Sequence, residues 1–220
     1  ELVDLEKGYS ANRPLSEFIG SLPTLATKPL TEAAASPIQA MAEELRRVDF
    51  RLPADVETIN FWPLGLSGKR QWPFGDGRRR MLIMSPFLSS ELLTELAGDR
   101  EGSILISRPD QLAQMPAETL ALFGRVYAIS PAAEDFNVAA EEAAETALSG
   151  LHAKLFIEDE GHDARVYTGS ANATNPAFSK NVEFLVELIG KKSKLGVVTL
   201  LDSSDDRRTA FQDLLVPWTP

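Results

Sequence analysis

The sequence predicts an α/β fold in which helices cover both faces of a mixed β-sheet. From residue 81 to residue 130, short apolar runs alternate with amphipathic segments, as strands and their connecting helices do. After residue 150, further segments alternate between apolar and polar residues with the period of a β-strand. Strands that first alternate with helices and then follow one another directly predict a mixed sheet in an α/β sandwich.

The composition is that of an ordinary globular protein. The chain has 220 residues, of which 44% are hydrophobic and 25% charged, so it is long enough to bury a substantial core. It has no apolar run of about eighteen residues and no signal-like beginning. We therefore expect a soluble, cytoplasmic protein that does not act at a membrane.

The net charge and the residue composition exclude several kinds of functional site. The chain contains no Cys and only two His, which argues against disulfides, thiolate chemistry and Cys- or His-rich metal sites. We expect a site without metal or cofactor. The net charge of −10 argues against a surface that binds nucleic acid over its whole extent, because such affinity comes largely from Lys and Arg. A site for phosphate groups must therefore be local.

The first 80 residues are weakly patterned apart from one helix. A helix is predicted from residue 36 to residue 48, with Ser36 as its cap, Pro37 at its first position and apolar residues along one face. The first residue is Glu rather than Met, which indicates a processed chain or a fragment of a longer protein. We therefore assign residues 1–80 to an N-terminal extension or to the remnant of a preceding half, and residues 81–220 to one domain.

Basic and aromatic residues are interleaved toward the end of this N-terminal segment. Such a combination can hold single-stranded nucleic acid, because the cations contact phosphates while the aromatic rings stack on bases. The simpler interpretation, which we favour, is an irregular segment whose aromatic rings pack inward and whose cations are solvated. If phosphate binding extends beyond the main site, the predicted substrate-binding residues are Lys69, Arg70, Arg78, Arg79 and Arg80.

Five elements are expected between residues 81 and 130. In order, they are a buried strand at residues 81–88, a helix at 90–97, a strand at 102–107, helical turns between 109 and 124, and a strand at 125–130. Residues 131–150 are acidic and rich in Ala, and they predict an exposed loop with a short helix. A final helix is predicted at residues 204–215.

The stretch from residue 151 to residue 190 carries the most informative pattern. Its first strand places alternate residues on opposite faces: Leu151, Ala153, Leu155 and Ile157 on one, and His152, Lys154, Phe156 and Glu158 on the other. His152 and Lys154 therefore emerge side by side. The second strand ends in a turn that presents Ser170 and Asn172, and the third begins with Asn181 and Glu183.

These polar residues occur in an order that resembles the signature of the phospholipase D superfamily. That signature is H-x-K, Asp after four further residues, a G-S-x-N turn and, in many members, N-x-E on the next strand. The matching residues are His152, Lys154, Asp159, Gly169, Ser170, Asn172, Asn181 and Glu183. The link between Asp159 and Ser170 is longer than the family usually has, which makes Asp159 the weakest match. The G-S-A-N-A-T turn looks most like the nuclease and tyrosyl-DNA phosphodiesterase branch.

The resemblance implies a phospholipase D-like sandwich that cleaves phosphodiesters through a covalent phosphohistidine on His152. Lys154 and Asn172 would hold the nonbridging oxygens, and Ser170 could add a hydroxyl donor. Glu183 would accept a hydrogen bond from the other ring nitrogen of His152. Asp159 has its counterpart in the motif, and we expect it to be structural at the end of the strand.

The implied mechanism needs two histidines, whereas the chain contains one H-x-K. The second motif would come from the partner in a homodimer, which we slightly favour, or from a missing upstream half. We expect DNA or RNA as the substrate. A catalytically silent binding or assembly module remains the alternative, and lipid hydrolysis is a weaker one because no amphipathic helix points to a membrane surface.

Overall fold

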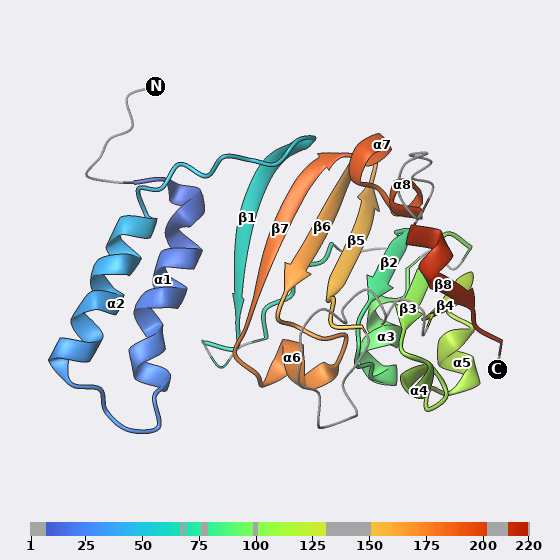
Figure 1. The fold of residues 1–220 in the computed structure, drawn as a ribbon, viewed down its shortest axis with the longest axis horizontal. Helices are drawn as coiled ribbons and strands as arrows, with labels where there is room; N and C mark the ends of the chain where they lie inside the picture. Colours follow the sequence, from blue (N-terminus) through green and yellow to red (C-terminus); the bar gives the residue numbers. More distant parts are fainter. Residues whose placement is uncertain are drawn as a thin grey trace, which may run out of the picture.

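The structure, a computed structural model, describes residues 8–66, 68, 70–75, 79–98, 101–130, 151–201 and 211–219. Its centre is a mixed 8-stranded sheet in the order β1-β7-β6-β5-β2-β3-β4-β8 (Figure 1). β2, β3 and β4 run parallel to one another, and the other neighbouring pairs are antiparallel. The predicted α/β class with a mixed sheet is therefore confirmed.

The described elements are short except at one end of the sheet. The strands are β1 Val56–Leu64, β2 Met81–Met84, β3 Ile104–Ser107, β4 Arg125–Ile129, β5 Leu155–Glu160, β6 Asp163–Gly169, β7 Glu183–Lys191 and β8 Leu215–Pro217. The α-helices are α1 Arg13–Ser21, α2 Glu32–Leu45, α3 Ser90–Leu96, α4 Pro109–Leu112, α5 Ala117–Leu120, α6 Asn175–Ser179, α7 Lys192–Leu195 and α8 Val197–Leu201. Each of these helices is too short or too polar to cross a bilayer.

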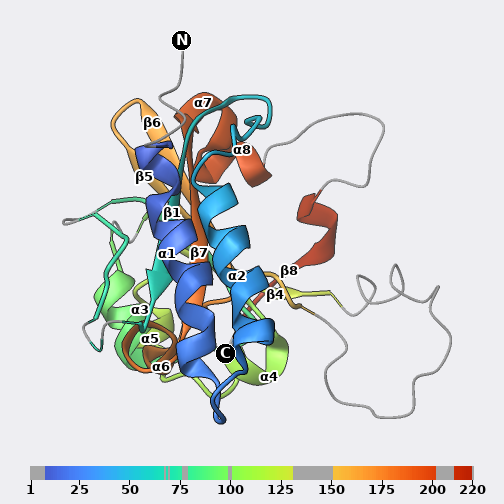
Figure 2. The same ribbon diagram turned by 90° about the vertical axis from the view of Figure 1, so that its left-hand side faces the viewer.

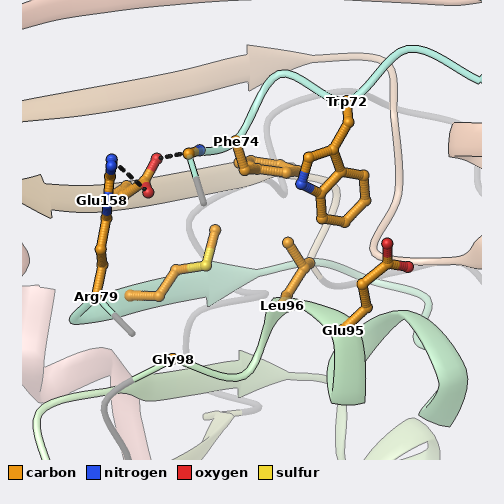
Figure 3. Close-up of a pocket in the computed structure, with 9 residues that line it drawn as sticks. Trp72, Phe74, Arg79, Glu95, Leu96, Gly98 and Glu158 are labelled. Carbon is orange, nitrogen blue, oxygen red and sulfur yellow. Dashed lines mark hydrogen bonds and ion pairs between the residues drawn. The ribbon is translucent and has the colours of Figure 1, made fainter. Parts of the chain in front are cut away.

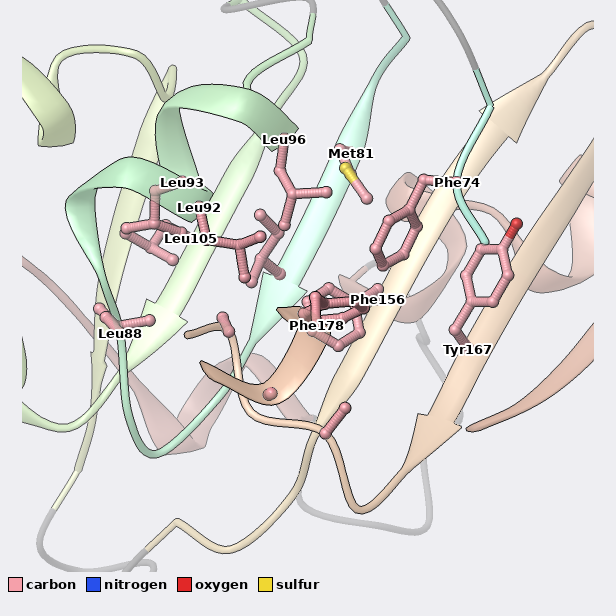
Figure 4. Packing of buried hydrophobic residues seen from close by; sticks show 14 of the residues in the cluster. Phe74, Met81, Leu88, Leu92, Leu93, Leu96, Leu105, Phe156, Tyr167 and Phe178 are labelled. Carbon is pink, nitrogen blue, oxygen red and sulfur yellow. The ribbon is translucent and has the colours of Figure 1, made fainter. Parts of the chain in front are cut away.

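Two hydrophobic cores lie on opposite faces of the sheet. Phe156 belongs to the first core and its neighbour Ile157 to the second, as the alternation along this strand predicts. The first core packs under α3 and α6, and includes Phe74, Leu92, Leu96, Leu105, Phe156, Tyr167 and Phe178 (Figure 4). The second core includes α8, and contains Leu82, Ile104, Ile106, Ile157, Val197 and Leu201. Helices therefore cover both faces, as expected.

The N-terminal helices differ from the prediction. α1 lies in a segment for which no helix was predicted, and α2 begins at Glu32 rather than at Ser36, so that Pro37 lies inside the helix. Glu32 and three Ala residues precede Ser36 and Pro37, and their high helix propensity favours a further turn before the proline, which removes one hydrogen bond of the helix. α1 and α2 pack against each other beside β1 (Figure 2), where Ser16 Oγ donates to Ala42 O at 2.7 Å.

The segment predicted to be irregular before residue 80 contains a long strand. β1 pairs with β7 along its whole length, at one end of the sheet. Pro63 is compatible with this position because an edge strand leaves alternate N–H groups without a ladder partner. The aromatic run Phe61–Trp62 with prolines nearby concealed the strand in the sequence. The sheet therefore draws on residues from both sides of position 80.

The C-terminal segment also differs from the prediction. Phe211–Leu214 form a 3₁₀ turn, and Leu215 begins β8, which pairs with β4. The end of the helix predicted at residues 204–215 is therefore wrong, because these apolar residues complete the sheet edge instead. The start of that helix and the loop predicted at residues 131–150 lie outside the described residues.

Candidate active site

Strand register brings four segments together at one edge of the sheet, the lower one in Figure 1. At the start of β5, Leu155 pairs with Thr168 near the end of β6 and with Met84 at the end of β2. Gly169, the last residue of β6, pairs with Leu185 near the start of β7. We call this edge, formed by residues 85–89, 152–154, 170–175 and 181–183, the site edge. Five predicted site residues lie on it: His152, Lys154, Ser170, Asn172 and Glu183.

His152 and Lys154 precede β5 instead of lying within it as predicted. His152 is exposed and Lys154 is half-buried. Lys154 Nζ donates to the His152 carbonyl oxygen at 3.0 Å, so the ammonium group folds back toward the histidine. The two residues are therefore close neighbours at the start of the strand, although the ladder hydrogen bonds begin only at Leu155.

The carboxylate of Glu183 is held on both of its oxygens. Ser170 Oγ donates to Oε2 in a short hydrogen bond, and Asn181 Nδ2 donates to Oε1 at 3.2 Å. Ser170 is itself fixed on β7, because its Oγ accepts from the Phe184 N–H and its own N–H donates to Phe184 O, both at 3.0 Å. The Ser170 hydroxyl proton is thus engaged with Glu183 in this structure.

Gly169 is required by close approach of the backbone. A Cβ atom at this position would lie 2.0 Å from the carbonyl oxygen of Phe184 on β7, a distance that no side chain can occupy. The glycine thus lets the end of β6 lie directly against β7. This contact explains why the G-S-A-N turn begins with Gly.

The other side of the turn is held by Ser85, which was not among the predicted site residues. Ser85 is fully buried after β2, and its Oγ accepts from the Ala173 N–H at 2.9 Å while it donates to Phe87 O at 2.8 Å. Ser89 N donates to Ala173 O at 3.0 Å, and Leu88 forms a parallel bridge with Ala173. A lone polar residue directly after a buried apolar strand was the signal that could have identified Ser85.

Replacing Ser85 by Ala should lower the stability of the protein. The change leaves the buried Ala173 N–H without its acceptor, which costs about 1–3 kcal/mol of unfolding free energy. Urea denaturation measures this loss. Ser21→Ala, which removes a hydroxyl at the end of α1, is the matched control, and equal losses in both variants would contradict the role given to Ser85.

Asn172 lies at the centre of the site edge. Its backbone oxygen accepts from the Thr174 N–H at 2.8 Å, which forms the tight turn before α6. Among the described residues, its side-chain Oδ1 is buried and has no hydrogen-bond partner. Buried amide groups are normally paired. An amide oxygen only accepts hydrogen bonds, so it is the Nδ2 group of Asn172 that can donate to a phosphate oxygen.

Asp159 lies away from the site edge. It is four residues along β5 from Leu155, a distance of about 13 Å in a strand. Its Oδ1 accepts from the Val197 N–H at 3.1 Å, at the start of α8, and its Oδ2 lies 3.8 Å from Arg80 NH1. The structure therefore does not bring Asp159 together with the other motif residues, and its contacts attach α8 to the sheet.

Arg79 and Arg80, two of the basic residues predicted to bind substrate, also lie apart from the site edge, before the start of β2. Arg79 pairs with Glu158 at 2.9 Å and with Glu160 at 3.2 Å, next to Arg80, which precedes β2. Arg70 forms two hydrogen bonds with Glu95, at 2.7 and 2.6 Å, and lies 4.3 Å over the Trp72 ring. Each of these cations has a carboxylate partner in the chain. Lys69 and Arg78 lie outside the described residues.

A partly exposed ion cluster, which we call the buried ion cluster after its two buried carboxylates, Glu158 and Glu187, occupies the first-core face toward the opposite edge. Its members are Arg79, Glu158, Glu160, Arg165 and Glu187. Glu158 is 3% exposed and also accepts from the Gly75 N–H, beside a cavity of about 240 Å³ that Trp72 and Phe74 help to line (Figure 3). The sequence pattern had indicated only that Glu158 shares a strand face with His152 and Lys154.

Glu187 is the most enclosed member of this buried ion cluster, at 1% exposed. It accepts hydrogen bonds from Arg165 at 2.7 Å and from Asn60 and Trp62 at 2.9 Å each. The bond to Glu187 raises the pKa of Arg165, and burial, aided by nearby Glu187, raises the pKa of the Tyr167 phenol. The cluster is therefore satisfied within the chain and stabilises the sheet. Within the described ranges, no group of His, Asp and Glu side chains could hold a metal ion.

Comparison with known proteins gives partial structural likenesses. No family model and no curated protein sequence matches the chain. A yeast tyrosyl-DNA phosphodiesterase aligns over 60% of this chain and 31% of its own, at 13% identity and a TM-score of 0.40. Nuc, a phospholipase D family member from Salmonella typhimurium, aligns over 66% of this chain and 83% of its own, at 16% identity and a TM-score of 0.34. This chain thus spans about a third of the length of the yeast phosphodiesterase that it matches.

Proposed function

We propose that the chain is a metal-independent phosphodiesterase of the phospholipase D type that cleaves DNA or RNA through a phosphohistidine at His152. The observation that carries the proposal is the meeting of separate segments at the site edge. His152 and Lys154 precede β5, Ser170 and Asn172 follow β6, and Glu183 begins β7. Strand pairing, rather than proximity in sequence, brings the motif residues to one edge.

The proposed reaction proceeds in two displacements. The His152 imidazole attacks phosphorus, a P–N bond forms and the bond to the leaving oxygen breaks, while a second histidine protonates that oxygen. The same histidine then removes a proton from water, which attacks phosphorus and releases His152. Lys154 and Asn172 stabilise the charge on the nonbridging oxygens in both steps.

Glu183 orients the nucleophile in this proposal. A carboxylate that accepts from one ring nitrogen of His152 leaves the other nitrogen free to attack and stabilises the charged imidazole. Ser170 and Asn181 fix the carboxylate of Glu183, so both are positioning residues. This assignment differs from the direct role expected for the Ser170 hydroxyl, because that hydroxyl already donates to Glu183.

The second histidine has to come from outside the described site edge. His162, the other histidine of the chain, is exposed in the turn between β5 and β6 at the opposite edge. A homodimer with two facing His152 residues supplies the missing group, and an upstream half with its own motif would do the same. Measurement of the solution mass distinguishes them: an active, strictly monomeric form of this chain would reject the dimer.

The test is cleavage of labelled DNA and RNA oligonucleotides in the presence of a chelator. We expect cleavage to persist with EDTA and a short incubation to trap a phosphoenzyme that is stable in alkali and labile in acid, as phosphohistidine is. Cleavage that depends on added metal would reject the mechanism. A stable protein that cleaves neither oligonucleotides nor phospholipid vesicles would favour the silent binding or assembly module, and turnover of vesicles alone would favour lipid hydrolysis.

A further inference from the structure

An exposed aromatic ring lies on the site edge beside the proposed phosphate-binding residues. Phe87 is 39% exposed, more than any other aromatic side chain in the described ranges. It follows β2, and its carbonyl oxygen accepts from the buried Ser85 hydroxyl at 2.8 Å. The backbone that carries the ring is therefore fixed by the same serine that holds the Ala173 amide.

The parallel bridge between Leu88 and Ala173 places Phe87 next to Asn172. Leu88 and Ala173 are buried in the first core, at 8% and 0% exposed. Because side chains alternate along extended backbone, the preceding residue of each segment points the other way. Phe87 and Asn172 thus lie on the same side of this bridge, where Phe87 is exposed and Asn172 is half-buried. Lys154 lies nearby, because its neighbour Leu155 pairs with Met84.

Arg108 holds the Phe87 ring from the next strand. It follows β3, and its guanidinium carbon lies 5.6 Å from the ring centroid, within the range of a cation–π contact. Asp110 fixes the guanidinium through a 2.9 Å ion pair, and the Arg108 side chain is 19% exposed. An exposed phenyl ring with this support loses little freedom when a second flat group stacks on it.

We propose that Phe87 is a stacking platform for a base of single-stranded nucleic acid, one that flanks the phosphate held by Lys154 and Asn172. The inference rests on the proposed phosphodiesterase function and names its substrate as single-stranded. Aromatic rings accept any base because every base has a π-face, whereas paired bases in a duplex have both faces covered by their neighbours. Phe87 is flanked by charged and amide side chains, which suits a nucleotide better than an apolar partner surface.

The test is the affinity of labelled oligothymidylate measured by fluorescence anisotropy, in a His152→Ala background that prevents turnover. Phe87→Ala should weaken binding about 5- to 150-fold, and Phe87→Trp should restore it. An abasic oligomer of the same length should bind both proteins equally, because it has phosphates but no bases. Leu25→Ala, which shortens a side chain that is 44% exposed in the 3₁₀ turn Leu22–Leu25, is the matched control and should bind as the background protein does.

Three outcomes overturn the stacking role. The first is equal affinity of the Phe87→Ala and background proteins for oligothymidylate, and the second is an equal loss for the abasic oligomer. The third is a fall in solution mass on Phe87→Ala, which would assign the ring to an interface between two copies. The proposed function fails differently: protein with His152 intact would bind oligothymidylate in a Phe87-dependent way without cleaving any oligonucleotide.

Discussion

Replacing His152 by Ala should lower the rate of phosphodiester cleavage at least about a thousandfold, because the residue forms the covalent bond to phosphorus in the proposed reaction. The same variant should form no acid-labile phosphoenzyme when it is incubated with labelled substrate. Because His152 is exposed and lies outside the strand, the fold should be retained, which thermal unfolding verifies. Steady-state cleavage of a labelled oligonucleotide measures the effect on the rate.

The second histidine of the chain provides a matched control. His162 is exposed in the turn between β5 and β6, and its backbone oxygen accepts from the Lys192 N–H at 3.0 Å whatever the side chain is. His162→Ala should therefore cleave at the normal rate. Full activity of His152→Ala, or the same loss in both variants, would sink the assignment of the nucleophile.

Replacing Glu187 by Ala should lower the free energy of unfolding more than any other substitution proposed for this protein. The change leaves NH1 of Arg165 and the side-chain donors of Asn60 and Trp62 without their acceptor in a partly buried part of the sheet, although Arg165 keeps its bond to Glu160. Loss of one partner from a buried ion pair costs about 3–5 kcal/mol, and we expect a value near the lower end because solvent still reaches Arg165, which is 33% exposed. Equilibrium urea denaturation gives the free energy of unfolding.

Glu57→Ala on the edge strand β1 is the control for this loss. Glu57 is 55% exposed and its contact with Lys191 is 3.7 Å long, so solvent screens the pair and its removal should leave the unfolding transition unchanged. If Glu187→Ala unfolds at the same urea concentration as Glu57→Ala, the buried ion cluster does not stabilise the sheet as described.

The strands after residue 81 could be predicted because burial in the two cores requires apolar residues at regular positions along them. Ile83 and Leu105 are fully buried in continuous apolar runs, and residues of β5 alternate between the cores. β1 was missed because its stability comes from pairing with β7, a contact between distant segments, while Pro63 argued locally against a strand. A local sequence pattern predicts a strand well only where burial gives the strand's own residues a continuous or alternating apolar pattern.

The candidate site could be predicted where its residues follow one another in order within one stretch of the sequence. His152, Lys154 and the G-S-A-N turn could be found from their order, and the sheet register brings them to one edge. Ser85 could not be found in that way, because its role depends on the distant amide of Ala173. The buried environment of Glu158 was equally hidden, since it depends on Gly75 and Arg79 from a separate segment.

The turn from Ser170 to Ala173 is attached on both sides, to β7 through Phe184 and to the end of β2 through Ser85. A loop tied in this way has no separate opening motion with a low free energy, so it should open only when the neighbouring strands separate. The conformational entropy of arranging Ser170 and Asn172 is therefore lost during folding, before any substrate arrives. In the reaction that we propose, substrate meets a preorganised edge, and binding free energy is left for charge stabilisation.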